Sequence, residues 1–346
     1  MPSTSTKSLG RLSDGSSSSE PSEKKQKLND PKLLVSQEMK AISESVEAFS
    51  NDIFKVVASD KQENYVSSSL SAFVAMAMVA YGAEGSTRVQ MFQGLYLPKN
   101  DNFAHLGFKE FLQALNNIPG VILQVANKVC MSKDCKIKDE YKEIIEEIFH
   151  SESDSFDFAK ATEVVKSANE WCTKNTRGKI KEILSTNDIE RDSVLLLLNV
   201  VYFNGNWKSK FKRWLTSSQR FHVSSTTTVV VPMMFNSGRF PYKDVTQFNA
   251  ECISIPYKNE DLSMIILLPK EIDGLKNLEE NWEKINSECL NASLFENYQD
   301  VNLDLPRFKV NTIIDLKQYL SQLGIDKMFS NEANFKGISD NATRGY

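Results

Sequence analysis

The sequence predicts an α+β fold in one large domain, with helices concentrated in the first half of the chain and strands in the second. Apolar residues recur at three- and four-residue steps between Pro31 and Val57, which is typical of an amphipathic helix. From Phe221 onward, short apolar runs alternate with turn residues, which is typical of successive strands. No stretch of linker composition separates the two halves, so we expect them to share one core.

The composition is that of a globular protein without a strongly charged partner. The 346 residues are 41% hydrophobic, which is enough for a sizeable core. The net charge of −4 disfavours nucleic acid and heparin as partners. The five cysteines are too scattered for a zinc site, and no apolar run approaches the length of a membrane-spanning helix. We therefore expect no metal, no cofactor and no membrane partner.

The segment 1–30 is rich in Ser and nearly free of apolar residues, so we expect a disordered tail. No apolar segment follows Met1 that would mark a secretory signal. The run Lys24-Lys25-Gln26-Lys27 matches either a short nuclear-import patch or, more commonly, a solvated basic tail.

Helical periodicity and capping residues define the first half of the fold. Ser69 or Ser71 is expected to cap the second helix, and Gly178 is placed to end the helix that starts at Ala161. The expected elements are, in order, the helix that starts at Pro31, a short strand and turn over Asn64–Ser71, a helix over Ala72–Ala80, a helix that begins at Ser86-Thr87, a helix over Asp101–Asn117, a strand over Val121–Cys130, and helices over Ile137–His150 and Ala161–Lys174.

The second half opens with a long apolar strand, Val194–Phe203. Its residues do not alternate with polar ones, which favours a strand in the interior of a large sheet with both faces covered. A buried amide without a partner costs roughly 1–3 kcal/mol, so Asn199 should be hydrogen-bonded. The later expected elements are strands over Phe221–Met234, Phe240–Tyr242, Glu251–Tyr257, Leu262–Leu268 and Val301–Phe308, and helices over Lys276–Asn286 and Ile314–Leu323.

Catalysis is disfavoured by the histidines. His105, His150 and His222 are the only three, and none lies in a nucleophile-elbow or metal-binding spacing. We therefore expect no catalytic residues and no enzyme. Asn291 and Asn341 open glycosylation sequons, which matter only if the chain is secreted.

A basic and aromatic cluster follows the long strand, with Trp207 and Trp214 beside the cations Lys208, Lys210, Lys212 and Arg213. Two interpretations remain open for it. It could bind an anionic partner, or it could be a solvated loop whose aromatic side chains anchor a neighbouring helix. The second is the commoner arrangement in a chain of acidic net charge.

Several motifs in this order resemble the serpin family, and together they cover nearly all of the chain beyond the tail. They are Ser68-Ser69-Leu70-Ser71, Gly82-Ala83-Glu84-Gly85-Ser86-Thr87, Ala168-Asn169-Glu170-Trp171, Asn175-Thr176-Arg177-Gly178, Leu198-Asn199-Val200-Val201-Tyr202-Phe203-Asn204-Gly205-Asn206-Trp207, Val231-Pro232-Met233-Met234, Leu305-Pro306-Arg307-Phe308 and Phe335-Lys336-Gly337-Ile338-Ser339.

The resemblance implies a serpin fold of about nine helices and three β-sheets, with a mostly antiparallel, five-stranded central sheet into which a cleaved reactive loop inserts during protease inhibition. It implies a serine-type endopeptidase inhibitor of the extracellular space. Ser68, Ser71 and Asn199 match the shutter, a polar cluster under the sheet that parts when the loop enters. Gly205 and Trp207 match a fold motif at the breach, the end of the sheet where the loop enters.

The sequence departs from the family at its end. After a serpin domain over 31–339, only the short tail 340–346 stands where the family continues into a central-sheet strand, the reactive loop and a final hairpin. Ser69 also stands where the family normally has Pro. We therefore expect that the chain as written does not inhibit, and that its target protease cannot be read from it. We also expect that its incomplete central sheet can self-associate.

Two functions stay open. The first is a protease inhibitor whose sequence here is truncated, with a serine protease as partner. The alternative is a non-inhibitory serpin relative that acts through protein contacts, in the cytoplasm or nucleus. Heparin is an unlikely partner in either case, because the segment Asp101–Asn117 holds only one lysine.

Overall fold

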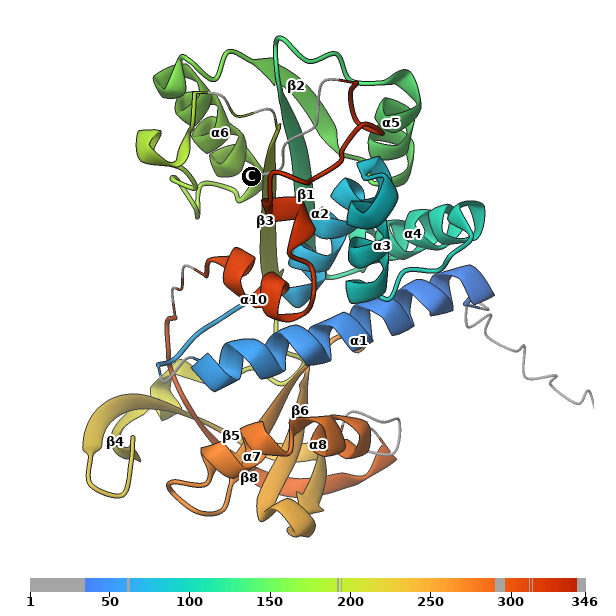
Figure 1. Ribbon diagram of the computed structural model, residues 1–346. Coiled ribbons are helices and arrows are strands. Elements are labelled where there is room, and N and C mark those ends of the chain that lie inside the picture. The colour runs from blue at the N-terminus through green and yellow to red at the C-terminus, as the bar shows by residue number, and fades with distance from the viewer. Residues whose placement is uncertain are drawn as a thin grey trace, which may run out of the picture. The chain divides into compact units, whose positions relative to one another are not determined.

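The structure is a computed structural model that describes residues 35–60, 63–191, 193, 195–289, 296–310, 312 and 314–340 (Figure 1). The chain from Ser36 to Tyr346 forms one compact unit, and the fold is described for that unit alone. The expected tail 1–30 and both expected glycosylation sites, Asn291 and Asn341, lie outside the described residues.

Nine α-helices are present among the described residues. The first, α1, buries a single stripe of its surface, whereas α2 is buried on nearly every side, as its apolar sequence predicts. The helices are α1 (Gln37–Asp60), α2 (Ser69–Gly82), α3 (Gly85–Gly94), α4 (Asp101–Asn116), α5 (Asp139–Glu143), α6 (Ala161–Asn175), α7 (Leu275–Glu280), α8 (Trp282–Cys289) and α10 (Leu316–Gln322). None in this part of the chain is both long and apolar enough to cross a membrane.

The described strands fall into two hydrogen-bonded groups. One has the order β2-β1-β3, with β2 parallel to β1 and β3 antiparallel to it. The other is antiparallel and has the order β4-β5-β6-β7, with β8 also paired to β5. The strands are β1 (Val121–Ser132), β2 (Glu152–Phe156), β3 (Leu195–Gly205), β4 (Ser217–His222), β5 (Thr228–Val245), β6 (Ala250–Pro256), β7 (Ser263–Pro269) and β8 (Tyr298–Pro306).

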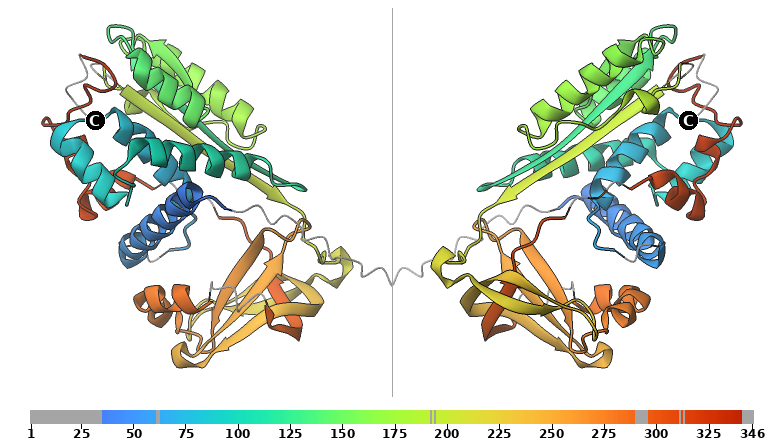
Figure 2. Two further views of the ribbon diagram at one scale, coloured as in Figure 1. Left: turned by 90° about the vertical axis from the view of Figure 1, so that its right-hand side faces the viewer. Right: turned by 90° about the vertical axis from the view of Figure 1, so that its left-hand side faces the viewer.

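The long strand β3 has both faces covered, as expected. Leu196, Leu198 and Val200 pack with α6, whereas Leu195 and Leu197 pack on the cluster that contains α2. Figure 2 shows β1 and β3 between these layers. Two expectations are wrong, however. Only Leu198 and Val200 are fully buried in β3, and among the described residues the strand lies at the edge of a three-stranded sheet rather than in the interior of a larger one.

The three expected sheets correspond to three ladders among the described residues, one of β1–β3 and two that share the continuous strand β5. Its first half pairs with β4 and β8, and its last residues, Tyr242–Val245, pair with β6. The strand β5 therefore takes part in both ladders of the second half. The expected overall class, a mixture of helices and mostly antiparallel strands, is confirmed.

The buried side chains form four clusters rather than the one shared core that was expected. The largest lies among α1–α4, the inner end of β1 and the C-terminal residues up to Ile338. A second lies between α6 and the sheet of β1 and β3. The other two belong to the strands of the second half, one of them under α7 and α8.

Several local predictions were wrong at turns and caps. Residues 64–68 form no strand, and the cap of α2 is Ser68, whose Oγ accepts a hydrogen bond from the Ser71 N–H. The cap of α3 is Glu84 instead of Ser86-Thr87. The left-handed residue nearest the end of α6 is Arg177, one residue before Gly178.

Three longer elements are also interrupted. The expected strand Phe221–Met234 is a hairpin, because the polar residues Ser224–Thr227 close a turn between β4 and β5. The expected helix Ile137–His150 is short and continues as a π-helical turn, Ile144–Ile148. The expected helix Lys276–Asn286 breaks at Asn281, whose side chain bonds back to the Asn277 carbonyl.

Candidate functional site

The free edge of β3 is the most unusual feature of the fold. Among the described residues, β3 pairs with β1 along its whole length and has no strand on its other side. Every second backbone N–H and C=O of β3 therefore points toward a space that no strand fills. Exposed edges of this length are uncommon in native proteins, because they invite another strand to pair.

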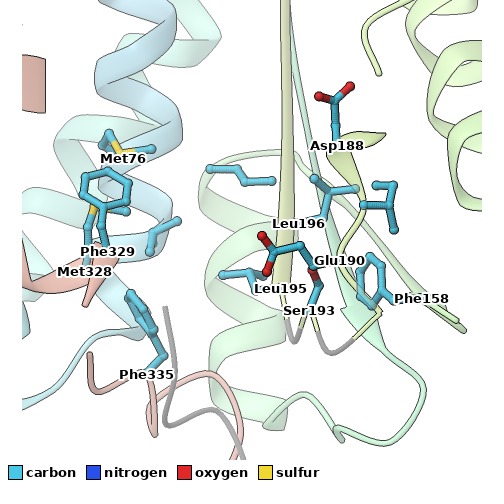
Figure 3. Close-up of a pocket in the computed structure, with 13 residues that line it drawn as sticks. Met76, Phe158, Asp188, Glu190, Ser193, Leu195, Leu196, Met328, Phe329 and Phe335 are labelled. Atoms are coloured by element: carbon cyan, nitrogen blue, oxygen red, sulfur yellow. The ribbon is translucent and has the colours of Figure 1, made fainter. Parts of the chain in front are cut away.

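A groove of about 330 Å³ lies along the start of this edge (Figure 3). Met76, Met328, Phe329 and Phe335 form one wall, and residues around Leu195 and Leu196 form the other. The walls are mainly apolar, with Asp188 and Glu190 at the rim. A groove of this kind suits the alternating side chains of an extended segment.

A second groove, of about 630 Å³, continues along the same edge. Met76 and Leu197 line both grooves, so the two adjoin under β3. The second groove has a polar stretch of lining where α2 begins, formed by four serines, Ser67, Ser68, Ser69 and Ser71.

The three expected shutter residues, Ser68, Ser71 and Asn199, all line this second groove. Ser68 and Ser71 bond to each other through the helix cap, at 3.2 Å from the Ser71 N–H to the Ser68 Oγ. Asn199 bonds elsewhere. Its Nδ2 donates to the Oδ1 of Asn127, directly opposite on β1, at 2.5 Å. The shutter role of the three residues stays a prediction, but the partner of Asn199 is Asn127 rather than a serine.

Asn127 was missed by sequence analysis, although a signal was present. It is a polar residue in the apolar run Val121–Cys130, and it is only 5% exposed. The argument that flagged Asn199 applies equally to Asn127, because a buried amide needs a partner. Two buried amides on neighbouring strands can satisfy this need by bonding to each other, as Asn127 and Asn199 do.

Lys128, the next residue of β1, is also buried, at 6% exposed. Its Nζ lies 2.5 Å from the Asp154 carboxylate and 3.6 Å from that of Glu152, both on β2. Burial acts to lower the pKa of Lys128, but the hydrogen bond and charge of Asp154 and the charge of Glu152 together raise that pKa above its ordinary value. The ion pairs thus join β2 to β1 beside the Asn127–Asn199 pair.

Gly205 and Trp207 lie together at the far end of β3, against Tyr257. The Trp207 and Tyr257 rings stack, with centroids 4.6 Å apart and planes 10° from parallel. A Cβ on Gly205 would lie 2.6 Å from the Tyr257 ring, so glycine is required for this close approach. Sequence analysis identified Gly205 and Trp207 but not Tyr257. Their role at the breach stays a prediction.

None of the three histidines lines either groove. His105 packs against the Tyr81 ring, and desolvation lowers its pKa. His150 follows the π-helical turn with a positive φ, and His222 bonds to Thr228 in the β4–β5 hairpin. Among the described residues, no group of three or more His, Cys, Asp and Glu side chains is placed to hold a metal.

Comparisons with known proteins agree with this geometry. A family model described as serpin (serine protease inhibitor) matches residues 44–344. Antichymotrypsin-2 of Bombyx mori is 32% identical over 81% of this chain and 74% of its own length. Serpin B4 of Homo sapiens is 32% identical over 87% of this chain and 82% of its own length. The solved structure of cleaved Serpin 42Da, 30% identical, superposes with a TM-score of 0.81 over 88% of this chain and 82% of that one.

Proposed function

We propose a function from the premise that this chain belongs to the serpin family: it is a serine-type endopeptidase inhibitor scaffold, built to accept a reactive loop as a strand beside β3. The observation that carries the proposal is the free edge of β3 above two adjoining grooves. The partner that follows is a serine protease, and the chain itself performs no catalysis.

The grooves supply what loop insertion needs. The edge offers backbone donors and acceptors, and Met76, Leu195 and Leu197 offer an apolar floor for alternate side chains of the added strand. In this proposal Ser68, Ser71 and Asn199 line the shutter, and Gly205 and Trp207 mark the breach at the end of β3. Self-association through the same edge is the competing use of this surface.

The 346 residues contain no stretch that matches a reactive loop, so we propose that these residues alone do not trap a protease. The recombinant 346-residue product is incubated with trypsin, chymotrypsin and elastase and examined by SDS gel electrophoresis. We expect no SDS-stable complex with any of the three. A stable complex would show that residues in this sequence act as a reactive loop, and it would overturn the proposal.

The inhibitor and the alternative, a non-inhibitory interaction protein, differ in a second experiment. The chain is extended past Ser339 with the strand, loop and hairpin of Antichymotrypsin-2, and the fusion is tested against chymotrypsin. Complex formation supports an inhibitor scaffold. Normal folding without complex formation, even at high protease concentration, favours the interaction protein. We propose the extracellular space as the location of the inhibitor, and the cytoplasm or nucleus for the alternative.

A further inference from the structure

The basic and aromatic cluster after β3 divides into two parts in the structure. Trp207 and Lys208 have partners within the chain, since Trp207 stacks on Tyr257 and Lys208 forms an ion pair with Glu260. Trp214, by contrast, lies in a short 3-10 turn, Arg213–Leu215, and is 79% exposed. The interpretation in which both tryptophans anchor a neighbouring helix is therefore wrong for Trp214.

The cations around Trp214 are not neutralised. Lys210, Lys212, Arg213 and Arg220 are all exposed, and in the part of the chain that the structure describes no ion pair joins any of them to a carboxylate. The Nζ of Lys212 lies 5.8 Å from the centre of the Trp214 ring. A local positive charge therefore persists on a chain whose net charge is −4. Carboxylates of a partner are the natural complement.

The turn that carries Trp214 directly precedes a strand with a free edge. Arg220 is on β4, all six residues of which are exposed, and among the described residues β4 pairs only with β5. Figure 1 shows this hairpin projecting from the rest of the sheet. Native edge strands are usually protected by proline, bulges or covering elements, and β4 has one Arg and no proline. Lys212, Arg213, Trp214, Arg220 and the free edge of β4 are together called the β4 patch.

We propose that the β4 patch binds an extended acidic segment of a partner protein, which adds to the sheet as a strand beside β4. The free edge supplies backbone hydrogen bonds, the cations pair with carboxylates, and Trp214 covers an apolar side chain of the segment. A lipid surface would use the cations and the tryptophan but not the backbone edge. Nucleic acid is disfavoured by the acidic net charge. This surface is separate from the β3 edge, and the inference does not depend on the proposed inhibitor function.

The probe is a fluorescein-labelled peptide of about ten residues, in which Glu alternates with Val and Tyr, a length that matches one strand. Binding to the full 346-residue chain is followed by fluorescence anisotropy. We expect saturable binding that weakens as NaCl is raised, and none to the same peptide with Lys in place of Glu. Reversal of the three charges, Lys212→Glu/Arg213→Glu/Arg220→Glu, should weaken binding about tenfold or more. Trp214→Ala should weaken it about fivefold.

The matched control is Lys179→Glu, which reverses an exposed charge elsewhere and should change affinity by less than about twofold. Circular dichroism confirms that each variant is folded. Strand addition itself is tested with two N-methylated peptides, each blocked at alternate residues, because only one set of N–H groups faces β4 in an added strand. One set should abolish binding and the other should preserve it.

Equal binding of the two methylated peptides would overturn strand addition. Absence of peptide binding, or binding that survives the triple charge reversal, would overturn the β4 patch as the site. Vesicles containing phosphatidylserine and a DNA oligonucleotide are titrated in parallel. Binding to either of these, with no binding of the acidic peptide, would assign the patch to a membrane or to nucleic acid and contradict the proposal.

Discussion

Asn199 of β3 and Asn127 of β1 face each other directly across the antiparallel ladder, and their side-chain amides share a hydrogen bond of 2.5 Å. The pair lies between β1 and β3, on the side of β3 opposite its free edge, and Asn199 also lines the second groove. A polar residue at a strand centre is usually unfavourable unless its partner is fixed. Here each amide is the partner of the other, in the register in which β1 and β3 pair.

Breaking this pair should destabilise the fold. Asn199→Ala leaves the Asn127 amide without a partner at 5% exposure, so we expect the free energy of unfolding to fall by about 1–3 kcal/mol. Urea denaturation measures the change. Asn204→Ala, an exposed position at the end of the same strand, is the control and should have an effect within about 0.5 kcal/mol. The double variant Asn127→Ala/Asn199→Ala should cost less than the sum of the single ones, and strict additivity would show that the bond contributes nothing.

The close approach of Gly205 to Tyr257 gives a second prediction. The Cβ of Gly205→Ala would lie 2.6 Å from a ring that is stacked on Trp207, so the ring must shift. We expect a loss of about 1–3 kcal/mol in unfolding free energy, with a change in the near-ultraviolet circular dichroism of Trp207. Gly238→Ala is the control, because its Cβ would meet nothing closer than 3.7 Å. If the two alanine variants behave alike, the contact with Tyr257 does not constrain Gly205.

The sequence predicted the elements with strong local periodicity and failed where distant contacts decide. The helices α1, α4 and α6 and the strand β1 lie close to their expected bounds. The covered faces of β3 were also predictable, because an unbroken apolar run needs neighbours on both sides. Its place at a sheet edge left no local signature, because strand neighbours are not encoded nearby in the sequence, and only the family resemblance, which implied an incomplete central sheet, indicated an exposed edge.

The strand β5 is a second case in which distant contacts, rather than the local sequence, decide the structure. The sequence Asn236-Ser237-Gly238 is typical of a turn, so two separate strands were expected. In the structure β8 pairs with this segment throughout, and the Ser237 Oγ donates to the Asn302 Oδ1 at 2.8 Å. Pairing with a partner some 65 residues away outweighs the local preference for a turn. The partner of Asn199, 72 residues away, was hidden for the same reason.

The buried Lys128 gives a pH dependence with a definite sign. Its pKa is raised in the folded state by Asp154 and Glu152, despite burial. The stabilisation from the cation is therefore fully present below the unfolded pKa of about 10.4 and is lost as the pH rises through the higher folded value. Burial raises the pKa of the neighbouring Cys130 thiol to about 12, so that thiol stays protonated over most of this window.

The measurement compares the wild-type chain with Lys128→Met in urea between about pH 8 and pH 11.5, a range that spans the lysine titration. We expect the stability difference between the two to be constant up to about pH 10 and then to shrink. Tyrosine and other lysine titrations are common to both chains and cancel in the difference. Lys179→Met, which removes an exposed lysine, is the control and should show no such trend. A difference that grows with pH would contradict the assignment of a raised pKa.

The grooves under β3 should accept an added strand, and their junction is the place to block it. A synthetic strand of small and apolar residues, at a concentration a hundredfold above its Kd, should stabilise the chain by about 2.7 kcal/mol and raise its Tm. Met76 lines both grooves, so Met76→Trp should fill the path and remove this Tm increase. Val89→Trp adds the same side chain at an exposed position of α3 and should leave the increase intact. Equal Tm increases in both variants would place the peptide elsewhere, because a filled groove cannot hold the side chains of a strand paired with β3.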